Sequence, residues 1–537
     1  MPEKNRVYRA RIEGYTSEGL GVARIDGQAV FVHRALRGED CDVLILKVLK
    51  NAAFGKAVRV YEPSPHRVEP DCPYYGRCGG CDFRHMDRTE ELAAKRQRVQ
   101  DALRRIGGSA VTVEGIDGGA PLHYRNKSQY PVAADGSVGF YKARSHQVVP
   151  VAQCLIQKPQ ADAAAQALRT YIASCGVSCY DEKTRRGLVR HLYIRTNGAG
   201  QSLICVVANG KKLPGEEELV RLLRQAAPET VGVVLGVNTQ PTGAVLGTEY
   251  RTLWGADVLT DTLCGLTFRL SVPSFYQVNR EMAERLYARA VEFAGLTGTE
   301  TVLDLYCGAG TITQVMARHA GRVIGAEIVP EAIEDAKANA KRNNVENVEF
   351  FCGDASAVAA DLAARGLRPD VICVDPPRKG LAPEVVRAAA QMAPQRIVYV
   401  SCDPATLARD VKLFGQEGYE AVRAAAVDMF PGTANVETIC LLSKLNAKQH
   451  IEINLDMDEL DLTDAEKKAT YQEIKDYVLE HSGLKVSSLY IAQVKQKCGI
   501  IERENYNKPK SEDAKQPQCP PDKEKAIKEA LTHFGMI

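Results

Sequence analysis

The stretch Val302-Leu-Asp-Leu-Tyr-Cys-Gly-Ala-Gly310 joins a short apolar strand, which ends at an acid, to a tight glycine turn. A helical pattern over 280–293 precedes this stretch, and strand-like and helix-like segments alternate from there to residue 443. Such alternation predicts a parallel, doubly wound α/β sheet that binds its ligands at the carboxyl ends of the strands. The expected strands are 301–305, 322–326, 348–351, 371–374, 396–400 and 438–442.

The glycine turn predicts a cofactor site, because glycines let the backbone approach a ligand and a helix N-terminus favours a carboxylate. Glu327 follows the second strand, about 20 residues after the glycine turn. This is the usual spacing for an acid that binds ribose hydroxyls. Asp354, in Gly353-Asp-Ala355, is placed for an adenine amine. The turn alone is compatible with NAD. Together with Asp375-Pro-Pro-Arg-Lys-Gly380 after the fourth strand, it indicates S-adenosylmethionine (SAM).

Cys402, in Ile397-Val-Tyr-Val-Ser-Cys-Asp-Pro404, is the most informative candidate catalytic residue. Methyl transfer to an amine or hydroxyl needs no thiol, whereas carbon 5 of a pyrimidine is a poor nucleophile. A thiolate that adds to carbon 6 activates carbon 5, and a base must then remove the carbon-5 proton. Glu437, in Asn435-Val-Glu-Thr438, is the candidate base.

Local sequence also suggests how the thiol is activated. A helix expected to begin near Thr406 should lower the pKa of Cys402 and favour the thiolate. The alternatives are structural: Cys402 as a buried thiol and Glu437 as a surface carboxylate between strands.

Three cysteines, Cys72, Cys78 and Cys81, share one loop rich in glycine and proline, in a chain with 16 cysteines. Their spacing predicts a soft metal site that needs a fourth ligand, for which Cys154 and His85 are candidates. Structural zinc sites usually combine two separate Cys-x2-Cys knuckles, whereas three cysteines plus one are more typical of an iron–sulfur cluster. Three unrelated free thiols are the remaining alternative.

Composition and pattern divide the chain into four regions. Residues 1–62 contain five short alternating runs between glycine-rich turns, which predicts an OB-like β-barrel of a kind that binds single-stranded nucleic acid. Residues 63–265 predict an α+β middle domain that carries the cysteine loop, and 266–445 the SAM-binding domain. Residues 446–537 predict a charged helical extension, with helices at 464–481, 487–497 and 522–534 that resemble a helix-turn-helix in outline.

Global properties restrict the class of protein. The chain has 537 residues, 45% hydrophobic and 25% charged, which is typical of a soluble globular protein with several domains. No apolar run approaches the roughly 20 residues of a membrane span, and the N-terminus lacks a signal-peptide core. A cytoplasmic location without membrane association is therefore expected. The net charge of +2 is too small to indicate nucleic-acid binding by itself.

Taken together, residues 1–444 resemble the RNA uracil-5-methyltransferases. The likeness rests on a TRAM-like N-terminal barrel and on the segments 275–279 (Phe-Tyr-Gln-Val-Asn), 304–308, 375–378, 401–404 and 436–438. It implies SAM-dependent methylation of uridine carbon 5, with Cys402 as nucleophile and Glu437 as base. It further implies SAM contacts from Gln277, Tyr306, Glu327 and Asp375, and a [4Fe-4S] cluster on Cys72, Cys78, Cys81 and Cys154.

The TRAM barrel and the cysteine pattern together resemble the 23S ribosomal RNA branch of that family more than the transfer RNA branch. The expected substrate is therefore 23S rRNA, with a uridine that is single-stranded or flipped out of its stack. No partner protein is implied, and a monomer is expected. The alternatives are a transfer RNA methyltransferase and a non-catalytic RNA-binding or ribosome-assembly factor. Two features depart from the family pattern: Asn435 stands where members often have histidine, and residues 446–537 have no counterpart.

Overall fold

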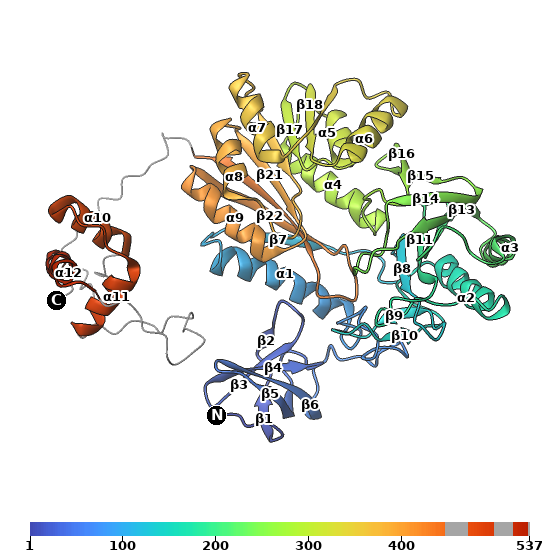
Figure 1. Cartoon of the computed structure of the whole chain (residues 1–537), viewed down its shortest axis with the longest axis horizontal. Coiled ribbons are helices and arrows are strands. Elements are labelled where there is room, and N and C mark those ends of the chain that lie inside the picture. The colour runs from blue at the N-terminus through green and yellow to red at the C-terminus, as the bar shows by residue number, and fades with distance from the viewer. Residues whose placement is uncertain (446–470, 499–518, 535–537) are drawn as a thin grey trace. The chain divides into compact units, whose positions relative to one another are not determined.

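The computed structural model describes residues 1–445, 471–498 and 519–534. The chain divides into two compact units, residues 1–447 and 448–537 (Figure 1). The larger unit contains three main sheets that follow one another along the sequence. Within the described ranges, no helix is long and apolar enough to cross a membrane.

The N-terminal sheet has six strands, one more than the five runs expected, because a two-residue strand forms in the first turn. Apolar and polar residues alternate along these strands, and the inward-facing positions form a separate small core. The strand order is β1-β5-β6-β4-β3-β2. The strands are β1 (Val7–Arg11), β2 (Gly14–Tyr15), β3 (Gly21–Ile25), β4 (Gln28–His33), β5 (Asp40–Val48) and β6 (Ala52–Glu62).

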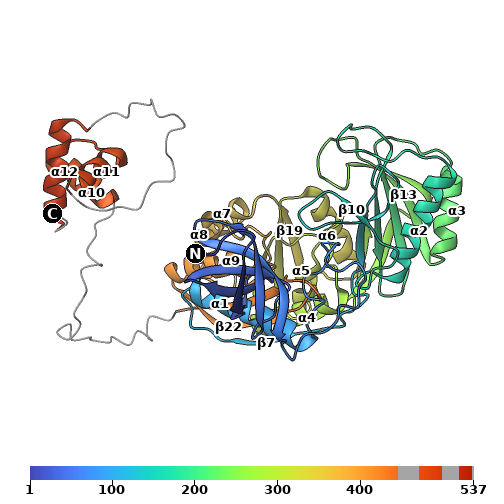
Figure 2. The same cartoon turned by 90° about the horizontal axis from the view of Figure 1, so that it is seen from below.

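The middle sheet has five strands in the order β14-β13-β12-β11-β8, with helices α2 and α3 packed against its core (Figure 2). Two small two-stranded sheets accompany it: β9-β10 lies between β8 and β11 in the sequence, and β15-β16 follows β14. The elements are β8 (Lys127–Pro131), β9 (Gly139–Tyr141), β10 (Val148–Pro150), α2 (Pro159–Ser174), β11 (Val189–Thr196), β12 (Ser202–Ala208), α3 (Glu216–Ala226), β13 (Thr230–Val237), β14 (Glu249–Gly255), β15 (Val258–Leu263) and β16 (Leu266–Ser271).

The C-terminal sheet has eight strands in the order β19-β18-β17-β20-β21-β23-β22-β7. Helices α1, α7, α8 and α9 contribute to the core on one face, and α4 and α5 to the core on the other. The strands are β7 (Val113–Asp117), β17 (Thr301–Leu305), β18 (Arg322–Glu327), β19 (Val348–Cys352), β20 (Val371–Val374), β21 (Arg396–Ser401), β22 (Tyr419–Val427) and β23 (Glu437–Lys444). The helices are α1 (Arg88–Arg105), α4 (Arg280–Ala294), α5 (Thr311–Ala317), α6 (Pro330–Arg342), α7 (Ala355–Ala364), α8 (Pro383–Gln391) and α9 (Pro404–Gln416).

This sheet confirms the doubly wound α/β fold, and it differs from the expectation at one edge. Strand β23 runs antiparallel to β21, and β22 antiparallel to β23. The sequence did not indicate β22, because alanine, which is depleted in strands, fills much of it. Strand β7 then pairs with β22, and α1 packs on α9. A segment that the sequence assigned to the middle domain thus completes the C-terminal sheet.

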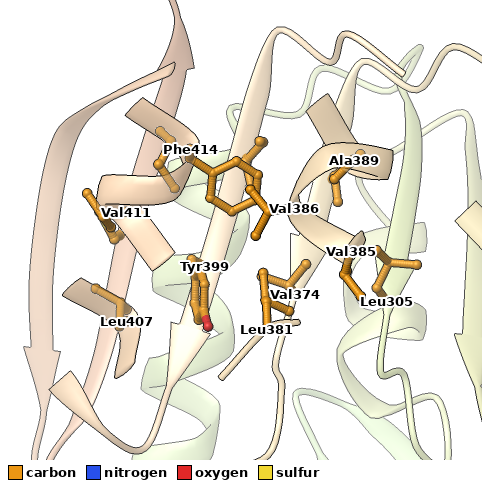
Figure 3. Packing of buried hydrophobic residues seen from close by; sticks show 14 of the residues in the cluster. Leu305, Val374, Leu381, Val385, Val386, Ala389, Tyr399, Leu407, Val411 and Phe414 are labelled. Atoms are coloured by element: carbon orange, nitrogen blue, oxygen red, sulfur yellow. The ribbon is translucent and has the colours of Figure 1, made fainter. Parts of the chain in front are cut away.

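Helix α9 is fixed by a packed core and by one buried carboxylate. Its residues Leu407, Val411 and Phe414 lie over Tyr399 of β21 (Figure 3). Asp410 of the same helix accepts hydrogen bonds from the Tyr399 hydroxyl (2.6 Å) and the Leu381 backbone N–H (2.8 Å). The helix is therefore tied both to the sheet and to the loop that follows β20.

The smaller unit has a core of its own. Its helices are α10 (Tyr471–Ser482), α11 (Ser488–Lys497) and α12 (Pro521–His533). Ile474, Val478, Ile491, Ile527 and Leu531 are almost completely buried against one another. Three helices were expected here, and residues 464–470 of the first expected helix lie outside the described residues.

Removing residues 446–537 should leave the larger unit folded, because none of its hydrophobic clusters includes a described residue of the smaller unit. We expect its thermal unfolding midpoint to change by less than about 2 °C, the shift that about 1 kcal/mol produces in domains of a few hundred residues. Calorimetry of the full chain and of the truncated chain measures this. A truncated chain that unfolds several degrees lower would contradict the division into two units.

Candidate active site

Cys402 and Glu437 meet at one edge of the C-terminal sheet because β21 and β23 are antiparallel neighbours. The last pair of their ladder joins Ser401 to Thr438, so the next position along places Cys402 opposite Glu437. Directly opposed residues in antiparallel strands have Cβ atoms about 5 Å apart. Sulfur and carboxylate are thus brought together by strand register.

The turn after β21 holds Cys402 at the start of α9. The Asp403 carboxylate caps this helix by accepting hydrogen bonds from the backbone N–H groups of Ala405 (2.9 Å) and Thr406 (3.1 Å). The Ser401 hydroxyl accepts from the Asp403 N–H (3.1 Å) and donates to the Asp403 carbonyl (3.0 Å). Cys402 is therefore braced on both sides, and its half-buried thiol remains accessible.

Burial dominates the electrostatics of this pair. Glu437 is 4% exposed, and its burial, together with the nearby Asp375 carboxylate, raises its pKa to about 8. Burial also raises the pKa of Cys402 to about 11, and the Glu437 carboxylate adds to this increase. Arg378 lies close enough to lower both pKa values. The expectation of a lowered thiol pKa was wrong, because burial and the neighbouring acid outweigh the helix start.

The glycine turn after β17 has the backbone shape that a closely bound ligand requires. Gly308 has a φ of 55° and open space where a Cβ would project. Its N–H donates to Glu327 Oε2 (3.2 Å), and Glu327 Oε1 accepts from the Val329 N–H (3.0 Å). Tyr306 also has a positive φ, 72°, at the start of the turn. Tyr306 and Glu327 thus lie at one turn, as the sequence indicated.

Two further acids border this turn. Asp304 is fully buried, accepts a hydrogen bond from the Thr313 hydroxyl (2.5 Å), and has a pKa raised by burial to about 8. Asp375 follows β20, next to β17 in the sheet, and burial raises its pKa to about 7. Asp304 and Arg378 stand within the sequence motifs, but no role was predicted for either. The available signal was that Asp304 is an acid within an apolar strand and that Arg378 lies in the loop directly after one.

The other expected cofactor residues lie in separate segments. Gln277 is largely buried in the connection between β16 and α4, and its backbone carbonyl accepts from the Asn126 amide (2.9 Å). Asp354 caps α7 by accepting from the Ser356 N–H (2.9 Å) and hydroxyl (2.5 Å). One Asp354 oxygen is thus occupied in holding the helix.

The four expected cysteine ligands line a single cavity. Cys72, Cys78, Cys81 and Cys154 all face it, together with Tyr74 and Phe140. His85, the other candidate, does not line this cavity, and its Nδ1 instead lies 2.6 Å from the Tyr75 hydroxyl. Among the residues that the structure describes, no three His, Cys, Asp or Glu side chains converge closely enough to hold a single ion. The four cysteines therefore line a cavity but do not converge on a single position.

A larger cleft of about 730 Å³ lies between the N-terminal sheet, α1 and the start of α9. Pro404 and Ala405, next to Cys402 in sequence, form part of its wall, as does Ala434. Four arginines also line it: Arg24, Arg37, Arg98 and Arg105. Arg24, Arg37 and Arg105 each pair with a carboxylate, and the cleft keeps an excess of cationic groups next to the Cys402 turn, which suits a polyanion.

The pKa of Cys402 should be measurable by alkylation with iodoacetamide in the absence of RNA. We expect the rate at Cys402 to rise with pH towards a midpoint near 11, because only the thiolate reacts. Glu437→Gln removes a negative charge that is present above pH 8, so the midpoint should fall. Mass spectrometry of the Cys402 peptide follows the reaction, with exposed Cys352 as the internal control. An unchanged midpoint in Glu437→Gln would contradict the contact between the two groups.

Comparison with known proteins agrees with this geometry. A family model described as tRNA (Uracil-5-)-methyltransferase matches residues 87–445, and a TRAM domain model matches residues 3–58. An uncharacterized RNA methyltransferase of Clostridium tetani is 43% identical and covers 83% of this chain and 98% of its own length. A second, from Halalkalibacterium halodurans, is 42% identical and covers 82% and 98%.

Among solved structures, the Pyrococcus abyssi tRNA (uracil-54, C5)-methyltransferase in complex with S-adenosyl-L-homocysteine is similar, with a TM-score of 0.66 and 26% identity. The match covers 81% of this chain and 99% of that one. These findings confirm an RNA-modifying enzyme that uses SAM and carries a TRAM domain, and they leave the non-catalytic alternative without support. The chain belongs to the tRNA (Uracil-5-)-methyltransferase family.

Proposed function

We propose that this protein methylates carbon 5 of a uridine in 23S ribosomal RNA through a temporary bond between Cys402 and carbon 6. The observation that carries the proposal is the position of Cys402 opposite Glu437 across the β21–β23 ladder. Methylation of a nitrogen or an oxygen needs neither a nucleophilic thiol, such as Cys402, nor a base that removes a proton from carbon, such as Glu437.

The first step belongs to Cys402. A uridine that has left its stack presents carbon 6, and the thiolate adds there, so that electron density rises at carbon 5. A pKa near 11 keeps most of the sulfur protonated at neutral pH, so the thiolate needs further stabilisation. The positive charge of Arg378 favours the anion and already contributes to this pKa, so the further stabilisation must come from other groups.

The second step belongs to Glu437. Once carbon 5 carries a methyl group, the Glu437 carboxylate takes the carbon-5 proton, the ring double bond re-forms, and the Cys402 sulfur leaves. A base is most effective when its pKa lies near the working pH, and burial brings Glu437 to about 8. Its burial therefore suits its role as the proton acceptor.

Gln277, Tyr306, Glu327, Asp354 and Asp375 are proposed to hold SAM, which when bound supplies an electrophilic methyl group on a positively charged sulfur. The open space above Gly308 fits close approach of a ligand to the backbone. Asp375 lies near Glu437, so two carboxylates offer negative charge to a cation at this edge. The residues present thus fit this ligand.

Cys72, Cys78, Cys81 and Cys154 are proposed to bind a [4Fe-4S] cluster. The support is that all four line one cavity without converging on a point, since a cluster presents a separate iron to each thiolate. The cluster would hold the cysteine loop together, and no electron transfer is needed for methylation.

Transfer RNA is the second candidate substrate. It is favoured by the likeness of most of this chain to the Pyrococcus abyssi enzyme, which acts on tRNA. The combination of TRAM domain and cysteine pattern supports 23S rRNA as the first candidate. In either case the arginines of the cleft beside the Cys402 turn would contact phosphates.

Methyl transfer from labelled SAM tests the reaction and its target together. We expect 5-methyluridine in unmodified 23S rRNA and much less in unmodified tRNA. Cys402→Ala should lower the rate by more than about 10³-fold, because the covalent step is lost. Cys175→Ala, which removes a partly buried thiol at the C-terminal end of α2 in the middle domain, serves as the control and should be active. Full activity of Cys402→Ala would refute the mechanism, and preference for tRNA would move the target to the second candidate.

Iron content and visible absorption of anaerobically purified protein test the cluster. We expect about four irons per chain. The iron should be lost in Cys154→Ala and kept in His85→Ala, because Cys154 lines the cavity and His85 does not. Zinc in place of iron, or loss of iron in His85→Ala with retention in Cys154→Ala, would contradict the proposed ligand set.

A further inference from the structure

The loop that leads into Glu437 connects β22 to β23, and we refer to residues 428–436 as the base loop. Val427 of β22 pairs with Glu437 of β23, so the base loop is closed by this pair. Glu437 therefore stands where the loop enters the sheet. Its position depends on the loop on one side and on the ladder on the other.

The segment that carries three of the cysteines, residues 72–83, contacts the base loop directly, and we call it the cysteine loop. The backbone N–H groups of Asp82 and Phe83 both donate to the Gly432 carbonyl, at 2.9 and 3.0 Å. The Asp82 carboxylate, through Oδ2, accepts from the Ala434 N–H at 2.9 Å. Three hydrogen bonds thus join the cysteine loop to a segment that ends three residues before Glu437.

Close packing accompanies these hydrogen bonds. Gly432 has a φ of 81°, and a Cβ added to it would lie 3.8 Å from the sulfur of Cys81. Phe83 and Ala434 are both buried and share a small hydrophobic cluster with Leu36 of the N-terminal domain. The base loop is therefore held against the cysteine loop over its second half.

The first half of the base loop is held by α1. Lys95 is 1% exposed, and its ammonium group donates to Asp428 Oδ1 (2.5 Å) and to the Phe430 carbonyl (3.0 Å). It also donates to Glu91 Oε1 (2.8 Å), which accepts from the Gly432 N–H (2.6 Å). These contacts hold residues 428–432 in place. None of them involves Ala434.

Ala434 is held on both sides of its backbone. Its N–H is bound by Asp82, and its carbonyl accepts from the Arg98 guanidinium at 2.6 Å. Removing the Asp82 carboxylate leaves the Ala434 N–H buried without that acceptor and removes one of the two hydrogen bonds that hold the Ala434 backbone before Glu437. Cys402 is braced independently, by the Asp403 cap and the Ser401 hydroxyl.

We propose that Asp82 is a positioning residue for Glu437, through which the cysteine loop sets the efficiency of proton removal. The inference rests on the proposed function. Because Cys402 does not depend on this contact, loss of Asp82 should slow the removal of the carbon-5 proton while leaving attack at carbon 6 and methyl transfer almost unchanged. The covalent, methylated protein–RNA complex should then accumulate.

Two labels separate these steps in the full-length protein. The RNA that the wild-type enzyme methylates carries tritium at uridine carbon 5, and SAM carries a carbon-14 methyl group. We expect Asp82→Ala to slow tritium release by about tenfold or more, the effect of losing one hydrogen bond to a charged acceptor. Its rate of carbon-14 incorporation into the covalent complex should stay within about twofold of wild type, which is a difference below 1 kcal/mol in the barrier.

The chain offers matched controls. Asp71 lies beside Cys72 as Asp82 lies beside Cys81, and it pairs with Arg84 within the same region without reaching the base loop. Asp71→Ala should therefore keep the wild-type ratio of the two rates. Asp82→Asn, whose amide oxygen still accepts from Ala434, should largely restore tritium release. If Asp82→Ala does not fold, Asp82→Ser gives the same comparison, because its shorter side chain cannot reach the Ala434 N–H.

Two results would overturn the inference: equal slowing of both labels in Asp82→Ala and Asp82→Ser, or no change in either label. Slowing of tritium release in Asp71→Ala to the same degree would also overturn it, because the effect would then belong to the cysteine region as a whole. Absence of a covalent complex between the wild-type protein and RNA containing 5-fluorouridine is a separate outcome. It would refute the proposed function itself.

Discussion

The antiparallel pairing of β21 with β23 is the constraint on which the rest of the site depends. It sets Cys402 opposite Glu437, although neither residue has a local sequence feature that would bring it to the other. A slip of one residue would turn every side chain of β23 to the opposite face and remove the base. Cys440 and Leu442 of β23 are buried in the same core as Tyr399 of β21, and Ile439 and Leu441 in the core on the other face, so a slip would disturb the packing on both faces. The packing of the core thus helps to keep Cys402 and Glu437 in their relative positions.

Three carboxylates, of which Asp304 and Glu437 are buried and Asp375 is partly buried, give this edge its electrostatic character. Burial raises the pKa of Asp304 to about 8, of Asp375 to about 7 and of Glu437 to about 8. A positively charged ligand near them favours their ionised forms and also favours the thiolate of Cys402. Binding of a sulfonium cofactor and activation of both catalytic groups are therefore coupled through the same charges. The raised pKa of the Cys402 thiol is consistent with the proposal that this nucleophile becomes reactive only when its ligands are bound.

The sequence predicted what depends on local pattern and failed where distant segments meet. The strands at 301–305 and 371–374 have the expected bounds, because apolar runs between glycine, proline and acid residues identify them. Strand β22 was missed because of its alanines, and the segments of β7 and α1 were assigned to the middle domain because edge pairing has no local signal. The pKa of Cys402 was misjudged for the same reason. The helix start is visible in the sequence, whereas the acid across the ladder comes from another strand.

Anchoring the base loop from two sides has a physical rationale in the order of the chemical steps. In the proposed mechanism, displacement of the nucleophile prevents the reaction, and no covalent bond to the RNA forms. In the same proposed mechanism, a base displaced after methyl transfer leaves the enzyme bonded to its RNA, so the position of Glu437 would determine whether turnover occurs. Asp82 and Ala434 are 352 positions apart in the chain, and their hydrogen bond forms only when the cysteine region has docked on the completed sheet. The segment before Glu437 therefore gains its Asp82 anchor only when the cysteine region and the C-terminal sheet have both folded.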